Sequence, residues 1–301
     1  MQSIEKDQSS KRNVWAKSQK NSDHILSSGL ALLCQAISNE FEAVKSTKPG
    51  VYLFSTKENR DQKTWLYIGE SKDLQQRTQS HCRTYKNSTF VKNYAVHEFQ
   101  SKSDTFLKQI MNRSRTDVYL QFVEITLGRK ELEEFGMVNL PTILNRFNTK
   151  KRNQTGIFYK NTKLWQAIQE NTPRLLAEGY QHFESLNYIH WSDARVPSLP
   201  GIYSVMSNND DLIYIGQTTN LKERYDTHSR RTYFSALRKN IGRTVLGSSF
   251  IAPKKFAPDV DILIDGYIEQ CKFGYLPVSV GRLEFEEYLI QNKSPILNRK
   301  V

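Results

Sequence analysis

The sequence predicts a protein of the mixed α/β (α+β) class with two similar domains in one chain. Two observations lead to this prediction. Three short strings occur twice in the same order, and between them lie patterns typical of short strands and amphipathic helices. The chain has 301 residues, enough for two domains of roughly 100–200 residues each. Its hydrophobic content of 38% allows each domain a core.

The repeat rests first on a string that occurs in both halves. YIGESKDLQQRTQSH spans Tyr67–His81 and YIGQTTNLKERYDTH spans Tyr214–His228, and the two align without a gap. Both start with Tyr-Ile-Gly and then have leucine, arginine and histidine at the same spacing. A shorter string, PGVY from Pro49 and PGIY from Pro200, precedes each copy.

A third matched string follows each copy. RKELEEFGMVNLPTILNR begins at Arg129 and RLEFEEYLIQNKSPILNR begins at Arg282. Aligning them on their shared ILNR, a shift of 153 positions, superposes two pairs of polar residues: Glu133 with Glu286, and Asn145 with Asn298. Copies of roughly 100 residues are far longer than a solenoid repeat, so we expect tandem domains.

Residues 1–48 are expected to form a polar tail and one helix. Residues 1–20 are rich in Lys, Ser and Gln, a composition typical of disorder. Apolar residues then recur at helical spacing from Asp23 to Val44. This amphipathic helix should either cover the first domain or contact a partner, and packing on the domain is the favoured interpretation.

The first domain, residues 49–148, is predicted to begin with a hairpin and continue through helices and a third strand. A polar loop, Thr56–Lys63, joins the two strands of the hairpin. The expected elements are the strands Val51–Phe54 and Trp65–Gly69, a helix from Ser71 to Cys82, the strand Val118–Thr126 and the helix Glu131–Val138.

Residues 149–198 are predicted to be a basic helical linker, with one or two helices in Leu164–Leu186 broken near Pro173. The second domain, residues 199–301, should repeat the order of the first. Its expected elements are the strands Gly201–Met206, Leu212–Gly216, Asp261–Asp265 and Cys271–Val280, and the helices Leu221–Arg231 and Leu283–Gln291.

Charge points to a polyanionic partner. The formal net charge is +12, which favours nucleic acid first and an anionic membrane surface second. Basic residues concentrate after His228, where two aromatic residues lie among them. From this run we expect the following residues to contact DNA: Arg230, Arg231, Arg238, Lys239 and Arg243.

Cysteine content and hydropathy predict a cytoplasmic protein without a membrane partner. The three cysteines, at 34, 82 and 271, form no CxxC or Cys/His cluster, which argues against a disulfide framework or a structural zinc site. No apolar run approaches the ~18 residues of a membrane span, and the N-terminus lacks the apolar core of a signal peptide.

Each copy supplies two tyrosines on paired strands, an arginine and a histidine four apart on one helix face, a glutamate and an asparagine. One carboxylate could hold one Mg²⁺ (or Mn²⁺) whose other ligands are water and a phosphate. A guanidinium suits the charge that develops on that phosphate, and tyrosine or histidine can accept a proton from water. Singly, each residue is more often structural; their recurrence in register favours one-metal phosphodiester hydrolysis.

These strings and their spacing resemble the GIY-YIG nucleases over Pro49–Arg146 and Pro200–Arg299. The resemblance implies a small α/β domain with a central three-stranded antiparallel sheet, a divalent metal and DNA as substrate. It implies that the tyrosines hold or deprotonate the attacking water, the arginine steadies the phosphate, the glutamate binds metal and the asparagine supports the site. The implied residues are Tyr52, Tyr67, Arg77, His81, Glu133 and Asn145, then Tyr203, Tyr214, Arg224, His228, Glu286 and Asn298, with Glu133 and Glu286 as metal ligands.

The first copy departs more from the family pattern than the second. Glu70 adds a negative charge directly after its YIG, Gly136 stands inside its last helix and Pro141 is one position early. We therefore expect both copies to cut, with the first slower.

The predicted function is a metal-dependent DNA endonuclease, restriction-like or in defence. Its two sites could reach both strands of a duplex from one pseudo-dimeric chain. The alternatives are a structure-specific repair or recombination nuclease with one active copy, and a non-catalytic DNA-binding protein that kept the fold.

Overall fold

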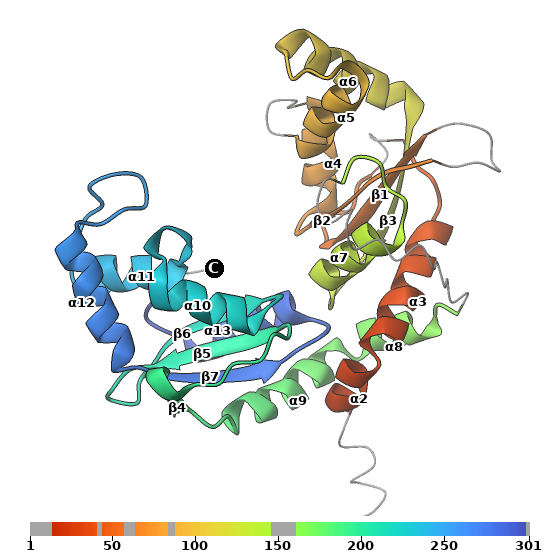
Figure 1. Ribbon diagram of the computed structural model, residues 1–301. Helices are drawn as coiled ribbons and strands as arrows, with labels where there is room; N and C mark the ends of the chain where they lie inside the picture. Colours follow the sequence, from red (N-terminus) through yellow and green to blue (C-terminus); the bar gives the residue numbers. More distant parts are fainter. Residues whose placement is uncertain (1–13, 41–43, 57–63, 84–87, 146–160, 299–301) are drawn as a thin grey trace, which may run out of the picture. The chain divides into compact units, whose positions relative to one another are not determined.

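The computed structural model describes residues 14–40, 44–56, 64–83, 88–145 and 161–298 (Figure 1). It divides into two compact units, which we describe separately. The N-terminal unit comprises residues 21–172, and the C-terminal unit comprises residues 1–20 and 173–301. Most of the tail predicted to be disordered, of the loop Thr56–Lys63 and of the basic stretch around 148–161 lies outside the described residues. No helix in the described part of the chain is both long enough and apolar enough to cross a membrane.

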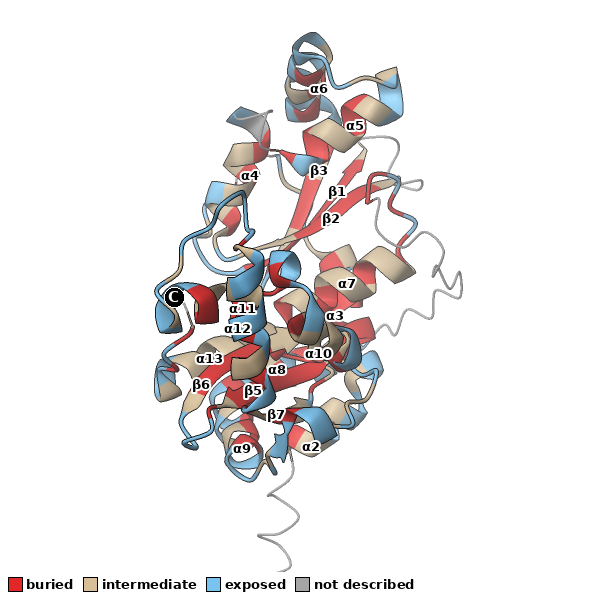
Figure 2. Cartoon of the chain, turned by 60° about the vertical axis from the view of Figure 1, so that its left-hand side comes forward, coloured by how far each residue is buried: buried red, intermediate tan, exposed pale blue. Residues whose placement is uncertain are grey.

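The N-terminal unit contains a three-stranded antiparallel sheet in the order β2-β1-β3. Its strands are β1 (Gly50–Thr56), β2 (Trp65–Ser71) and β3 (Val118–Glu124). The predicted hairpin is β1–β2, and β3 pairs along the other edge of β1. All three strands are largely buried (Figure 2), as expected for a small sheet covered by helices on its faces.

Helices of the N-terminal unit connect and cover this sheet. Between β2 and β3 the chain forms α4 (Leu74–Arg83), α5 (Thr89–Phe99) and α6 (Asp104–Asp117), and α7 (Arg129–Asn139) follows β3. The predicted N-terminal helix is α3 (Ser22–Gln35), which packs on α7, β1, β3 and α8 (Lys163–Glu170). It ends at Gln35, short of the predicted Val44, because the chain bends away to pair Asn39 with Leu120 of β3.

The C-terminal unit contains a four-stranded antiparallel sheet in the order β4-β7-β5-β6. Its strands are β4 (Ile189–His190), β5 (Gly201–Met206), β6 (Leu212–Thr218) and β7 (Lys272–Pro277). Strand β4 was not predicted, because two residues carry too little pattern; it pairs with β7 at the sheet edge. Strands β6, β5 and β7 lie in the same order as β2, β1 and β3 of the N-terminal sheet.

Helices of the C-terminal unit follow the same plan. They are α10 (Leu221–Arg230), α11 (Ala236–Asn240) with a π-helical turn at Ile241–Val245, α12 (Pro258–Glu269) and α13 (Arg282–Lys293), with short 3-10 helices at Trp191–Asp193 and Thr232–Phe234. From β1 in one unit and from β5 in the other, the described residues therefore run strand, strand, three α-helices, strand, α-helix.

The predicted strand Asp261–Asp265 is wrong, since these residues lie inside α12. Pro258 opens this helix at a position where its missing N–H costs nothing, and acidic residues in the first turn favour the helix dipole. Ile264 and Ile268, four residues apart, form its buried face. The β-branched residues of this segment favour a strand when the sequence is considered alone, which is why a strand was predicted.

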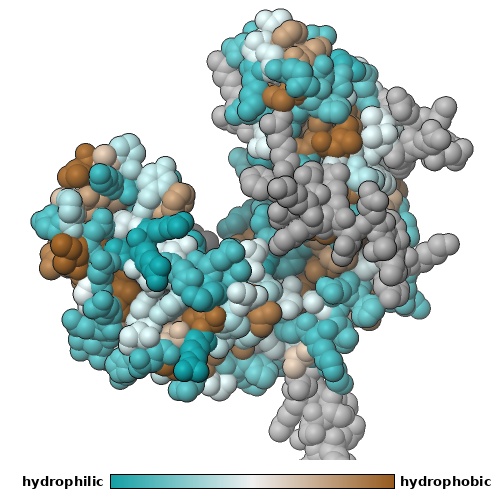
Figure 3. All heavy atoms as spheres, viewed as in Figure 1, coloured by the Kyte–Doolittle hydropathy of each residue, from teal (hydrophilic) through white to brown (hydrophobic). Residues whose placement is uncertain are grey.

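The remaining helices belong to the units rather than to a separate tail and linker. In the C-terminal unit, Trp15 of α2 (Val14–Lys20) packs on Phe285 of α13, with ring centroids 4.9 Å apart, and bonds through its backbone N–H to Glu178 of α9 (Thr172–Glu184). The division expected at residues 48/49 and 198/199 thus differs from the compact units. Hydrophilic residues cover most of the visible face of each unit (Figure 3).

Candidate active site

Tyr203 lies at the centre of the site in the C-terminal unit. It stands on β5 opposite Gly216 of β6. A Cβ added to Gly216 would lie 2.3 Å from the Tyr203 hydroxyl, so this glycine of the YIG string is required for the tyrosine to lie across β6. Tyr214 stacks beside it, with ring centroids 6.1 Å apart. Tyr203 is fully buried, whereas Tyr214 keeps an exposed fraction of 7%.

Helix α10 brings an arginine and a histidine to the Tyr203 hydroxyl. Arg224 Nε donates to this oxygen at 3.2 Å, and His228 Nε2 lies 2.8 Å from it. The two side chains meet one atom because residues four apart share a helix face. The hydroxyl is thus fixed by a cation and an imidazole at once.

Ser235 extends this hydrogen-bond chain and was missed by the sequence analysis. Its Oγ lies 2.6 Å from His228 Nδ1 and accepts the backbone N–H of Arg238 as the N-cap of α11. The signal was present: serine follows the histidine by seven positions in both copies, at Ser235 and at Ser88. The alignment had stopped at the histidines.

Burial sets the protonation states along the chain. Burial, assisted by Arg224 and Arg238, holds the pKa of His228 well below its ordinary value, so the imidazole is neutral near pH 7. Burial and the neighbouring Tyr214 raise the pKa of Tyr203 well above its ordinary value, although Arg224 opposes this. Tyr203 is therefore a neutral phenol at rest.

Glu286 comes from α13 and reaches β6. Its Oε1 accepts the backbone N–H of Gln217 at 3.2 Å. Burial raises the pKa of the Tyr214 hydroxyl, and the Glu286 carboxylate raises it further, which places this charge near the tyrosine pair. Among the described residues, no group of three or more His, Cys, Asp or Glu side chains gathers at one point. A metal at Glu286 would thus rely on substrate and water for its other ligands.

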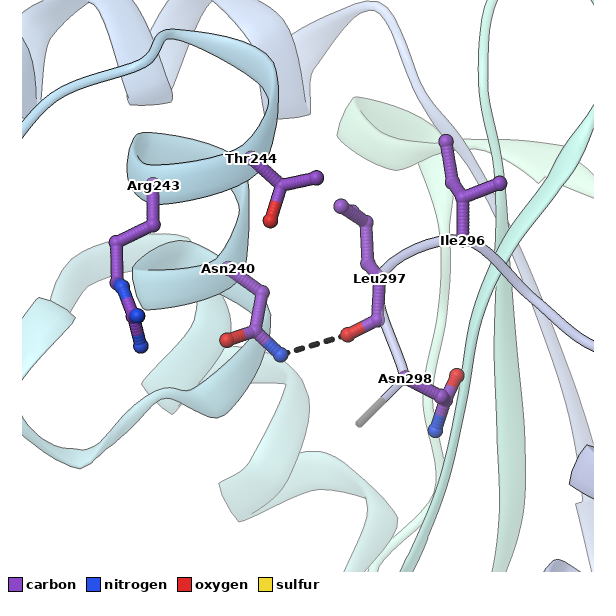
Figure 4. Close-up of a pocket in the computed structure, with 6 residues that line it drawn as sticks. All are labelled: Asn240, Arg243, Thr244, Ile296, Leu297 and Asn298. Carbon is purple, nitrogen blue, oxygen red and sulfur yellow. Dashed lines mark hydrogen bonds between the residues drawn. The ribbon is translucent and has the colours of Figure 1, made fainter. Parts of the chain in front are cut away.

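Asn298 supports the site rather than facing a ligand. Its Oδ1 accepts the N–H of Ile215 at 2.9 Å, and its Nδ2 donates to the Ile215 carbonyl at 2.8 Å. Both polar ends of the side chain are thereby engaged by β6. The same segment borders a surface pocket of about 460 Å³ (Figure 4). The pocket is lined by Asn240, Arg243, Thr244, Ile296, Leu297 and Asn298.

The N-terminal unit reproduces the tyrosine–arginine–histidine arrangement. His81 Nε2 lies 2.9 Å from the Tyr52 hydroxyl, and Arg77 Nε donates to the same oxygen at 3.3 Å. His81 Nδ1 lies 2.6 Å from Ser88 Oγ. Burial, with Arg77, lowers the pKa of His81 to about 3, and burial, with nearby carboxylates, raises that of Tyr67 to about 12.

Asn145 and the YIG glycine of the N-terminal unit also match their counterparts. Asn145 bonds to both backbone groups of Ile68, each at 2.8 Å. A Cβ on Gly69 would lie 2.4 Å from the Tyr52 hydroxyl. The six expected site residues of each copy therefore occupy equivalent places on the strands and helices of their units.

The carboxylates are where the two sites differ. In the N-terminal unit, Lys130 Nζ lies 2.5 Å from Glu133 Oε2, and Arg129 Nε lies 2.8 Å from Glu70 Oε2. The aligned positions of the C-terminal unit carry Leu283 in place of Lys130 and Gln217 in place of Glu70. Glu133 is thus paired with a lysine on its own helix, whereas the position aligned with that lysine, 283, carries a leucine.

Gly136 has a packing role in α7. A Cβ there would lie 2.3 Å from Ile68 Cδ1 of β2 and 3.4 Å from Leu30 Cδ1 of α3. The glycine lets α7 approach the sheet beneath α3, which offsets its helix cost of about 1 kcal/mol. The departure that we interpreted as a weakness of the first copy is a close contact in its core.

The basic run after His228 is only partly a surface. Arg230, Arg231 and Arg243 are exposed, and Lys239 is partly exposed. The expectation that Arg238 contacts DNA is wrong, since this residue is 2% exposed. Its guanidinium lies 2.6 Å from Asp265 of α12, where it ties α11 to α12.

Comparison with known proteins agrees with this geometry in the C-terminal unit. Residues 199–300 match the family model described as the GIY-YIG catalytic domain. The C-terminal unit therefore carries a GIY-YIG catalytic domain, a domain of the DNA endonuclease type. The N-terminal unit lies outside this match, and no curated protein was found to match the chain.

Proposed function

We propose that the protein is a metal-dependent DNA endonuclease that hydrolyses phosphodiester bonds at the site in the C-terminal unit. The observation that carries this proposal is the Tyr203 hydroxyl, which His228 and Arg224 hold between them inside a GIY-YIG catalytic domain.

Arg224 receives the scissile phosphate. Its Nε is held by Tyr203, and its Nη1 donates to the Phe234 carbonyl at 3.4 Å, so the guanidinium is oriented before substrate arrives. Burial lowers its pKa, but the tyrosines and Glu286 raise it more, and the group stays charged. A preorganised cation of this kind stabilises the charge that develops on phosphate during displacement.

Glu286 would hold Mg²⁺ or Mn²⁺. A single carboxylate, partly exposed and fixed by the Gln217 N–H, fits a hard cation that takes its other ligands from a phosphate and water. When bound, the ion polarises the phosphate and neutralises the departing oxygen. The protein's part is to aim the carboxylate toward the space beside Tyr214 and Arg224.

Tyr214 is the tyrosine that can meet water, since it alone of the pair keeps exposed surface. Its hydroxyl hydrogen-bonds to Tyr203, which continues the chain to His228 and Ser235. We assign Tyr214 to the attacking water: as the water oxygen bonds to phosphorus, its proton enters this chain toward His228. A phosphate bound to Arg224 offsets the positive charge that otherwise disfavours a protonated His228.

We infer that the N-terminal unit is a second domain of the same kind. The support is the shared strand and helix order and the matching Tyr52, Arg77, His81 and Ser88 contacts. A restriction-like or defence enzyme that acts on duplex DNA from one pseudo-dimeric chain remains part of the proposal, as does a cytoplasmic location.

The proposal is tested by incubating supercoiled plasmid with the full chain in Mg²⁺, in Mn²⁺ and in excess EDTA. We expect nicked or linear DNA with either metal and intact DNA in EDTA. Binding without cutting under every condition would support the alternative, a DNA-binding protein that kept the fold. Cutting that persists in EDTA would contradict a metal-dependent mechanism.

A further inference from the structure

We propose that the site of the N-terminal unit binds a DNA phosphodiester without a divalent metal, because Lys130 occupies the place beside Glu133 that corresponds to the one where Glu286 would hold a metal in the C-terminal unit. The inference rests on the proposed function in one respect: it treats the N-terminal unit as a second copy of the domain. It departs from the sequence-based expectation that Glu133 is a metal ligand and that the first copy cuts.

The residues present do not fit a metal at Glu133. Lys130 and Glu133 stand three apart on α7, and the ammonium lies 2.5 Å from Oε2. Their side chains are 35% and 12% exposed, so the carboxylate is the more enclosed partner. Burial lowers the pKa of Lys130, but Glu133, Glu134 and Glu70 together raise it more, which keeps the ammonium charged. A dication would have to displace this cation from an enclosed oxygen.

Ion pairs neutralise two carboxylates of the N-terminal site. Lys130 pairs with Glu133, and Arg129 pairs with Glu70. At the aligned positions the C-terminal unit has Leu283 in place of Lys130 and keeps an arginine, Arg282, in place of Arg129. The lysine next to the metal-binding carboxylate is therefore what distinguishes the N-terminal site.

Arg77 then supplies the positive charge that meets the phosphate. The Tyr52 hydroxyl holds its Nε at 3.3 Å, and His81 holds that hydroxyl at 2.9 Å, as in the C-terminal unit. The N-terminal unit therefore keeps the side chains that orient a phosphate. Lys130 occupies the position of a metal that would activate hydrolysis. Such a site retains DNA without cutting it.

The test exchanges the two residues that distinguish the sites. Bound Mn²⁺ per full-length chain is counted by electron paramagnetic resonance in four proteins: wild type, Lys130→Leu, Leu283→Lys and the double variant. We expect one ion in the wild type, two in Lys130→Leu, none in Leu283→Lys and one in the double variant. Lys48→Leu removes another ion-paired lysine of the N-terminal unit, bonded to Glu124 at 2.7 Å, and should leave the count at one.

DNA binding in EDTA gives a second readout that a loss of folding would not imitate. Anisotropy of a labelled duplex should show that Arg77→Ala binds about tenfold more weakly, the loss of one charged hydrogen-bonding contact. Lys48→Leu should bind like the wild type. Circular dichroism and thermal unfolding restrict both comparisons to folded variants.

Two ions in the wild type, or no gain in Lys130→Leu, would overturn the inference, as would unchanged DNA binding by Arg77→Ala in EDTA. Failure of the proposed function is distinguishable, since it would appear in the plasmid assay, as DNA that stays intact with either metal or as cutting that does not need metal, whatever the ion count.

Discussion

Tyr203 shows at the residue scale how a common side chain becomes specialised by its neighbours. A tyrosine in a strand is usually a core residue, and this one is fully buried. Its hydroxyl nevertheless contacts a buried histidine, a buried tyrosine and a partly exposed arginine. Buried polar networks of this kind persist where each member is satisfied.

Removing the Tyr203 hydroxyl should therefore disable cutting without unfolding the domain. We expect Tyr203→Phe to slow single-turnover cleavage about 100-fold, within the range for loss of one proton-transfer group. Tyr275 stands opposite Tyr203 on β7, and its hydroxyl bonds to the Arg195 carbonyl instead of to the site residues, so Tyr275→Phe should leave the rate unchanged. Equal rates for Tyr203→Phe and wild type would remove this tyrosine from the mechanism.

The two buried histidines should make stability depend on pH. The folded-state pKa is about 3 for His81 and well below the ordinary value of 6.5 for His228, so between pH 3 and 6.5 the unfolded chain binds more protons. Stability should be complete above pH 6.5 and fall as the pH decreases, by about 1.4 kcal/mol per pH unit for each histidine. Urea unfolding from pH 7 to 5 measures this slope.

A matched pair of variants isolates the contribution of His81 to that slope. His81→Gln should lose the part that one proton contributes, while the exposed His182→Gln should keep the full slope. An identical slope in wild type and His81→Gln would contradict a neutral, buried imidazole at this position.

Sequence reasoning reached the residues that both copies share and missed those that depend on packing. Tyrosine, arginine, histidine, glutamate and asparagine were visible because their spacing recurs. The burial of Arg238 could not be predicted from the sequence. A run of basic residues has the same pattern whether its side chains face solvent or, as Arg238 does, an aspartate on α12. The spacing of Lys130 and Glu133 predicts an (i, i+3) ion pair on one helix. It does not predict that this pair lies beside the tyrosines and the arginine of the site.

At the element scale, the hairpin of each unit is the part that local pattern predicts best. Pro-Gly, four apolar residues, a polar turn and Tyr-Ile-Gly specify β5 and β6 almost to their bounds. Helix α12 was misassigned because its β-branched residues suggest a strand, whereas its start signal at Pro258 and the packing of Ile264 and Ile268 decide for a helix. Tertiary burial overrides local propensity in such segments.

The glycine of β6 gives a direct test of this element. Gly216→Ala would place a Cβ 2.3 Å from the Tyr203 hydroxyl, so the ring must move away from His228 and Arg224. We expect at least about a 100-fold loss of cleavage and a lower unfolding midpoint. Gly266→Ala, in α12 where nothing lies within 4 Å of the added atom, should be neutral or stabilising by up to about 1 kcal/mol. Similar behaviour of the two variants would contradict the close contact.

At the scale of the whole molecule, the chain carries a net charge of +12 and divides into two units with the same order of elements. The length and the repeated strings were enough to predict two domains. They could not show that α2 and α9 belong to one unit and α3 and α8 to the other, because this depends on which helix face finds which core.

Binding to DNA should depend steeply on salt through the exposed part of the basic run. Each phosphate contact contributes about −0.9 to the slope of log K against log salt. Replacing Arg230, Arg231 and Arg243 together by alanine should therefore flatten the slope by up to about 2.7. Arg238→Met should instead lower the unfolding midpoint, since it removes a buried guanidinium bonded to Asp265. An unchanged slope in the triple variant would place the DNA on another face.

Cleavage in the C-terminal unit should depend on a metal held by one carboxylate, that of Glu286. The cleavage rate of the Glu286→Gln variant is the most direct test of this dependence. Glutamine keeps the size of the side chain and can still accept the Gln217 N–H, but it lacks the charge that holds a dication. Glu287→Gln is the neighbouring control. In saturating Mg²⁺ we predict that Glu286→Gln binds the duplex but cuts it at least about 1000-fold more slowly than the wild type. Glu287→Gln should cut at the wild-type rate. Cleavage by Glu286→Gln at the wild-type rate would contradict a metal-binding role for this carboxylate.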